Sequence, residues 1–77
     1  MKFVANFKDG TGKILRSVHI EEPGGQADKA CARAFCVAVG DAKLYEDFEN
    51  IEILDGSHPE VARQYHRRTA RALAYDG

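Results

Sequence analysis

The chain has 77 residues, with 11 lysines and arginines against 12 aspartates and glutamates, a formal net charge of −1 at pH 7. A chain this short forms one domain and buries only about 60% of its unfolded surface, so we expect a partner or a second copy to add stability. The near-neutral total excludes a wholly basic nucleic-acid binder, and no stretch is long and apolar enough to predict a membrane span.

The N-terminal third of the chain alternates between apolar and polar side chains. Residues 2–8 predict a half-buried strand that begins at once, so we expect no signal peptide. Residues 13–20 alternate again after the turn sequence Asp9-Gly10-Thr11-Gly12. The two segments together predict a β-hairpin.

The period then changes to that of a helix. Apolar residues recur three and four apart and form one stripe: Ala27, Ala30, Cys31, Ala34, Phe35, Ala38 and Val39. Cys31 and Cys36 are separated by a helical rise of about 7.5 Å, which is too far for a disulfide. We therefore expect free thiols and a reducing, cytoplasmic location.

The last third of the chain predicts one more strand and one more helix. Residues 41–46 read as a connection, and residues 47–54 predict a third strand with imperfect alternation. Ser57 and Glu60 have the spacing of a capping box, which predicts a helix from about His58 to Ala74.

These elements predict an α+β fold of order β-β-α-β-α in a single domain, residues 1–77. We expect a three-stranded antiparallel sheet of order 2-1-3 with the first helix packed on one face. The ββαβ body covers residues 1–56, and residues 57–77 form a basic C-terminal helix. This helix or a second copy of the chain is then needed to cover the other face.

Charge divides the chain into two parts. Residues 58–77 carry four arginines and two acids, a net of +2, whereas residues 1–57 carry seven basic and ten acidic residues, a net of −3. A basic segment on an acidic body indicates a surface that meets a partner.

Five residues of the basic segment are the candidate partner-binding site: Arg63, Arg67, Arg68, Arg71 and Tyr65. Three of the arginines recur every four residues and would line one side of a helix. Arginine suits phosphate and carboxylate alike, and a tyrosine can anchor an interface. A solvated helix face is the plain alternative.

A secondary acidic surface is expected around the third strand, from Glu46, Asp47, Glu49 and Glu52. Such charges commonly discourage unwanted strand pairing at an edge. They could also dock on a basic groove, as a mimic of nucleic acid does.

Site chemistry is sparse in this sequence. The cysteines and histidines lack the spacing of a metal site, the hairpin turn lacks the lysine of a phosphate loop, and we expect no cofactor. A histidine such as His19 could approach Cys31 and activate its thiol, but the spacing does not require it. A small thiol- or histidine-dependent enzyme is therefore the third and least favoured hypothesis.

The layout resembles small accessory proteins of phages and other mobile elements, including anti-CRISPR inhibitors. The residues that carry the resemblance are MKFVANFKDGTGK, ADKACARAF and FENIEIL, within residues 1–54. The resemblance implies a cytoplasmic, stoichiometric binder that blocks a host complex, and it implies no particular site residue.

The leading hypothesis is a non-enzymatic binding module that occupies a surface of a larger protein or nucleoprotein complex. We expect it to be a homodimer or to gain stability from its partner. The alternative is a nucleic-acid binder that uses the same arginines. If all four neutralise phosphates, the logarithm of its affinity falls against that of salt with a slope of about −3 to −4.

Overall fold

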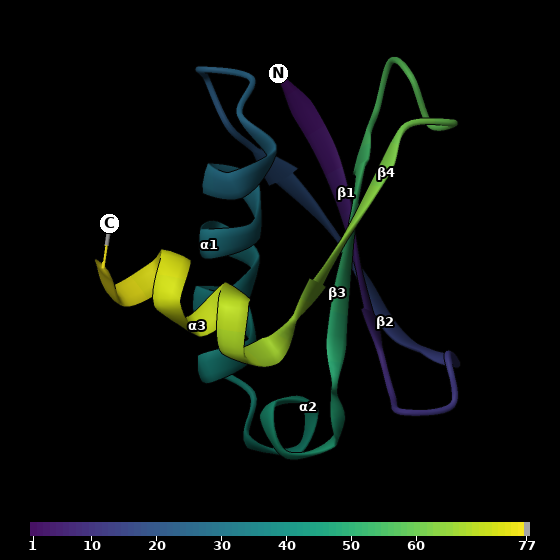
Figure 1. Cartoon of the computed structure of the whole chain (residues 1–77), viewed down its shortest axis with the longest axis vertical. Helices are drawn as coiled ribbons and strands as arrows, with labels where there is room; N and C mark the ends of the chain where they lie inside the picture. Colours follow the sequence, from purple (N-terminus) through teal and green to yellow (C-terminus); the bar gives the residue numbers. More distant parts are fainter. Residues whose placement is uncertain (77) are drawn as a thin grey trace.

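The computed structural model describes residues 1–76, and the side chains of residues 1–75, as an α+β fold with four strands and three helices (Figure 1). In chain order the elements are β1 (Lys2–Lys8), β2 (Ile14–Glu21), α1 (Ala27–Val39), α2 (Ala42–Asp47), β3 (Asn50–Asp55), β4 (Ala62–His66) and α3 (Arg67–Asp76). No helix within this part of the chain has the length and apolarity needed to cross a membrane.

The sheet has the order β2-β1-β3-β4, and each neighbouring pair is antiparallel. The α+β class, the hairpin, the helix over residues 27–39 and the order 2-1-3 are therefore confirmed. The count of three strands and two helices is wrong, because the sheet gains β4 and the chain gains α2.

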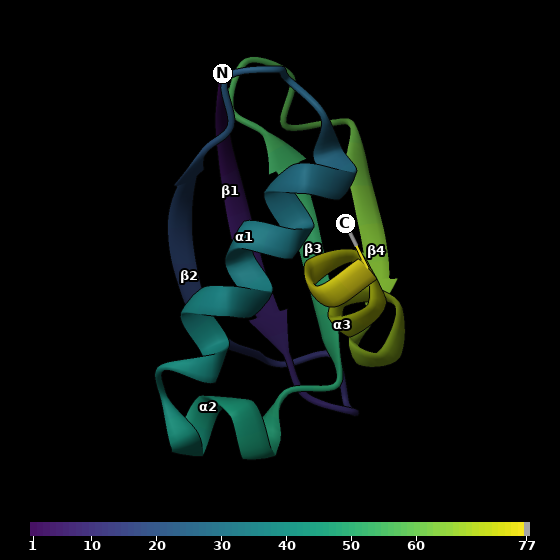
Figure 2. The ribbon, with the colours of Figure 1, turned by 90° about the vertical axis from the view of Figure 1, so that its left-hand side faces the viewer.

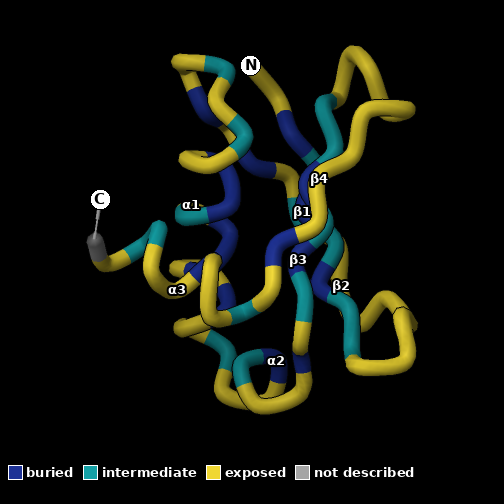
Figure 3. The backbone as a smooth tube through the Cα atoms, in the orientation of Figure 1, coloured by how far each residue is buried: buried dark blue, intermediate teal, exposed yellow. Residues whose placement is uncertain are grey.

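Both long helices cover the same face of the sheet, and α2 closes one end (Figure 2). The buried residues lie between these two layers (Figure 3). From α1 the fully buried residues include Ala30, Ala34 and Ala38, whose small side chains let α3 pack close beside it. The basic C-terminal segment therefore does not cover the opposite face of the sheet, which stays open.

The predicted helix over residues 58–74 is in fact a turn, a strand and a shorter helix. The backbone N–H groups of Ser57 and His58 donate to Asp55, at 2.8 Å to its carboxylate and 3.1 Å to its carbonyl, so this segment forms a turn. Residues Ala62–His66 then pair with β3, and α3 begins at Arg67. Pairing satisfies backbone groups of β3 and buries Tyr65, gains that outweigh the modest helix propensity of this segment.

The predicted connection at residues 41–46 is the short helix α2. Asp41 caps it, because its carboxylate accepts the N–H of Leu44 at 3.2 Å. Leu44 and Phe48 point into the core. The third strand consequently begins at Asn50 rather than at Asp47.

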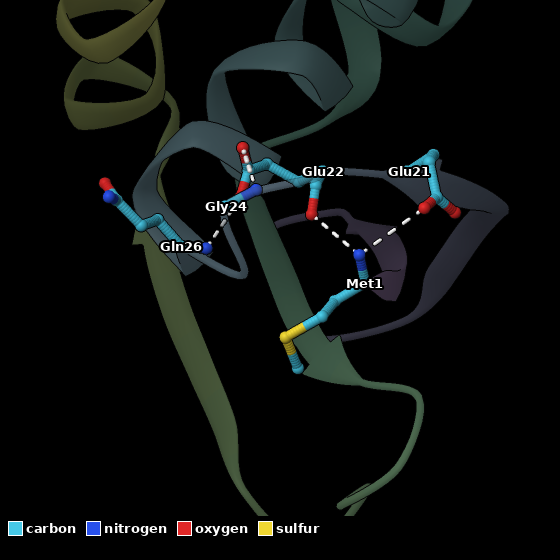
Figure 4. Close-up of polar contacts among 5 residues, drawn as sticks. All are labelled: Met1, Glu21, Glu22, Gly24 and Gln26. Carbon is cyan, nitrogen blue, oxygen red and sulfur yellow. Dashed lines mark hydrogen bonds and ion pairs between the residues drawn. The ribbon is translucent and has the colours of Figure 1, made fainter.

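Glu22 holds the loop between β2 and α1 (Figure 4). Its buried carboxylate accepts the backbone N–H of Gln26 at 2.7 Å and that of Gly24 at 3.1 Å. These hydrogen bonds, the one from Gln26 first, lower the pKa of Glu22 from its ordinary value. Its backbone pairs with Met1, by an N–H to carbonyl bond of 2.9 Å in each direction.

Candidate binding surface at the α3 arginines

Arg67 is fixed to the rest of the protein. Its guanidinium donates to the carbonyl of Phe48 at 2.7 Å and to that of Tyr45 at 2.8 Å. It also lies over both rings, 4.7 Å from the centroid of Phe48 and 4.9 Å from that of Tyr45. A cation on the last carbonyls of a helix is favourable, so Arg67 caps the C-terminal end of α2.

The carbonyls that Arg67 holds belong to an aromatic cluster. Phe48 meets Phe7 and Phe35 edge to face, with ring centroids 5.4 and 6.1 Å apart. Tyr45 contacts Phe35 in the same way at 5.8 Å. Arg67 therefore joins the start of α3 to the core.

Arg63 and Tyr65 are likewise separated from the other candidates, because both belong to β4. Arg63 lies opposite Ile53 and lines a separate hollow of about 420 Å³ together with Asp28 and Asp55. The predicted row of Arg63, Arg67 and Arg71 along one helix is thus wrong, because a strand ends between the first two.

Tyr65 is a core residue and not an exposed anchor. Only 8% of it is exposed, and its hydroxyl donates to the carboxylate of Asp28 at 2.6 Å. Burial, and then the bond to Asp28, raise the pKa of Tyr65 to about 12. The phenol therefore links β4 to the first turn of α1.

Arg68 and Arg71 are the members of the predicted set that remain exposed around one surface depression of about 590 Å³. We call this depression the arginine hollow, and its lining consists of Phe35, Tyr45, Glu49, His66, Arg67, Arg68 and Arg71. Among the side chains that the structure describes, no carboxylate lies within 4.0 Å of the guanidinium of Arg68 or Arg71.

Neighbouring side chains shape the rim of the arginine hollow. The Nδ1 atom of His66 accepts the backbone N–H of Arg68 at 3.2 Å, and its Nε2 atom lies 3.7 Å from the Glu49 carboxylate. Tyr75 is 62% exposed, and the guanidinium of Arg71 lies 6.0 Å from its ring centroid. The surface therefore combines two free cations with aromatic faces.

Phe35 and Tyr45 line the arginine hollow, although neither residue was predicted from the sequence to be part of a binding surface. Both come from segments more than 20 residues before α3, on α1 and α2. No sequence spacing relates them to the arginines, so only the folded chain brings them together.

The four predicted acids do not lie on one element. Glu46 and Asp47 are on α2, Glu49 precedes β3, and Glu52 lies on the open face of the sheet. There the carboxylate of Glu52 accepts from Asn6 at 3.0 Å, Lys8 at 3.1 Å and Gln64 at 2.6 Å.

These hydrogen bonds lower the pKa of Glu52 from its ordinary value, and the bond from Asn6 has the largest effect. Ser17 continues the row across the sheet with a bond of 2.5 Å to Asn6. Glu52 thus connects β3 to β1 and β4, the bond between Ser17 and Asn6 adds β2, and the carboxylate of Glu52 is paired with Lys8 within the chain.

The thiols and His19 are also placed apart. Cys31 is fully buried under the sheet, and burial, with a smaller effect of Asp28, raises the pKa of its thiol to about 12. Cys36 is exposed, and both cysteines are free. His19 is opposite Val4 on the open face, so the sheet lies between it and Cys31.

No three His, Cys, Asp or Glu side chains within residues 1–75 are grouped so that they could hold a metal ion. Comparison of the chain with family models, curated proteins and solved structures finds no match. The function therefore has to be argued from the surface itself.

Proposed function

We propose that this chain is a non-enzymatic binding module whose arginine hollow docks on an acidic surface of a larger protein or nucleoprotein complex. The observation that carries the proposal is the pair of exposed guanidinium groups of Arg68 and Arg71, which have no carboxylate partner among the described side chains and lie beside the rings of Tyr45 and Tyr75. Arginine and tyrosine are the side chains that most often dominate binding energy at protein interfaces.

The support for the hollow is rigid, which favours binding. Arg67 is fixed to α2 through two hydrogen bonds, and α3 packs against α1. A preformed surface loses little conformational entropy when a partner binds. Arg68 and Arg71 can therefore meet carboxylates in bidentate geometry without reordering the backbone.

Nucleic acid is the alternative partner for the same surface, because guanidinium groups and aromatic rings also suit phosphates and bases. The fold places Arg63 at a separate hollow and bonds Arg67 to carbonyls, so two of the four arginines, Arg68 and Arg71, are available for phosphate in the arginine hollow. With two neutralised phosphates the salt slope becomes about −2 instead of −3 to −4. Two cations are few for a surface that follows a phosphate backbone, which favours a local acidic site on a protein.

The test compares three tagged chains in a lysate of the cells that naturally contain the protein, with and without nuclease. The chains are the natural one, a double variant with Arg68→Glu and Arg71→Glu, and a control with Lys29→Glu. Lys29 is exposed near the start of α1 and does not line the hollow, so the control reverses charge outside it.

We expect the natural chain and the control to capture the same protein despite nuclease, and the double variant to lose it. Equal capture by the double variant would refute the role of the hollow. Capture that disappears with nuclease, and oligonucleotide binding whose salt slope is about −2, would support the nucleic-acid alternative. The phage-type inhibitor role implied by the resemblance stays a prediction until that partner is identified.

A further inference from the structure

Strand β2 is a long, exposed edge of the sheet. It has eight residues and pairs with β1 on one side only. Ile14 and Leu15 at its start are 49% and 37% exposed, and Val18 is partly exposed. An uncovered edge of this length is a template for pairing with another strand.

The pairing with Met1 shows which backbone groups of β2 are free. Glu22 exchanges both backbone hydrogen bonds with Met1, so its N–H and C=O point towards β1 (Figure 4). These directions alternate along an antiparallel strand. The backbone groups of Ser17, His19 and Glu21 therefore point away from the sheet.

When two copies of β2 run antiparallel, the charges of one copy are complementary to those of the other. Its basic start has Lys13, and also Arg16, which is paired with Asp41 at 2.9 Å. Its acidic end has Glu21, which is 63% exposed and 3.4 Å from the N-terminal ammonium. Antiparallel pairing of two copies near Ser17 places each basic start opposite an acidic end and brings the exposed apolar side chains together.

The other edge of the sheet lacks this property. Strand β4 contains Arg63 and His66 and no acid. Arg67 and Arg68 follow directly after its last residue, His66. Two copies of β4 would bring like charges together.

We propose that β2 pairs antiparallel with β2 of a second copy of this chain and forms a continuous sheet of two molecules. The arginine hollow adjoins the opposite edge, at β4 and α3, so a dimer carries one hollow at each end. One strand pair is smaller than the roughly 1,200 Å² of a stable interface, so the dimer is weak and depends on concentration.

The test is sedimentation velocity over a range of concentrations, in reductant because Cys36 is exposed. His19→Pro removes an N–H that points away from the sheet and so keeps the pairing with β1. Ala62→Pro is the matched control. The backbone N–H of Arg67 donates to the segment before β3, and these directions alternate along β4. The N–H of Ala62 therefore points to solvent, and proline removes no bond to β3.

We expect His19→Pro to raise the dimer dissociation constant about tenfold or more, because a symmetric pair loses two hydrogen bonds. Ala62→Pro should leave the constant unchanged. Circular dichroism checks that both variants are folded.

A charge exchange provides a second test should the proline unfold the chain. Lys13→Glu and Glu21→Lys should each weaken the dimer, and the two together should restore it. A natural chain that stays monomeric at all concentrations, or a dimer that these changes leave intact, overturns the proposal. A dimer that is lost only with Arg68→Glu and Arg71→Glu also overturns it, because the hollow then makes the contact.

Discussion

Replacing Arg67 by methionine should destabilise the protein although Arg67 looks like part of a basic surface. The change removes two hydrogen bonds from a charged donor, of 2.7 and 2.8 Å, and two cation–π contacts with Tyr45 and Phe48. A charged hydrogen bond contributes about 1.5–3 kcal/mol and a cation–π contact about 0.5–1 kcal/mol. Because Arg67 is partly exposed and methionine retains the apolar stem, we expect a loss of about 3 kcal/mol in the free energy of unfolding.

That loss is large for a domain of this size, whose whole stability is roughly 4–11 kcal/mol. It corresponds to a fall of roughly 12–24 °C in the melting temperature. Urea unfolding followed by circular dichroism measures it, with Arg68→Met as the adjacent control on an exposed side chain. Arg67→Lys should fall between the two, because it keeps the charge but not the planar fork. Equal stability of the Arg67→Met and Arg68→Met variants would show that Arg67 does not hold α2.

Three further predictions concern buried polar groups and thiols. Tyr65→Phe should lower the free energy of unfolding by about 1–2 kcal/mol in urea titrations, because the bond to Asp28 is lost. Glu22→Gln should destabilise the protein at neutral pH, since a lowered folded pKa gives stability that is present above the unfolded pKa near 4.5 and lost as pH falls through the folded value. Alkylation at pH 8 should label Cys36 in the folded protein and Cys31 only after unfolding, because burial raises the pKa of Cys31 to about 12.

Each of these three predictions has its own contrary result. Tyr75→Phe is the control for the phenol, since Tyr75 is exposed, and an equal effect of both would contradict the role of the Asp28 bond. For Glu22, unfolding curves of the natural and variant chains should converge below pH ~4.5, and a constant difference would contradict the pKa argument. For the thiols, mass spectrometry of the native protein should find one label rather than two.

The local sequence pattern was sufficient to predict the elements in which that pattern repeats over several helical turns or several strand residues. The alternation in residues 2–8 and 13–20 predicted the hairpin, and the apolar stripe from Ala27 to Val39 predicted α1 at its observed bounds. The pattern is clearest in β1 and α1, because each of these two elements buries one face along its length. The sequence also located the basic segment and showed that its charge differs from that of the body.

Tertiary structure decided the fate of the C-terminal segment. The capping-box spacing of Ser57 and Glu60 predicted a continuous helix. In the fold, residues 62–66 pair with the edge of β3 instead, and Tyr65 is buried with its hydroxyl bonded to Asp28. Six-residue α2 was too short to show a helical period. Intrinsic propensities differ by less than about 1 kcal/mol per residue, so such long-range gains override them.

The site changed with the fold. Sequence alone determined that four arginines stand within nine residues, but not that they would separate. The strand-to-helix break at Arg67 places Arg63 at a separate hollow, and Arg67 lies over the rings of Tyr45 and Phe48. Arg68 and Arg71 line the arginine hollow without a carboxylate partner among the described side chains. A charge pattern gives the number of cations in a segment, whereas contacts between distant residues determine which of them can reach a partner.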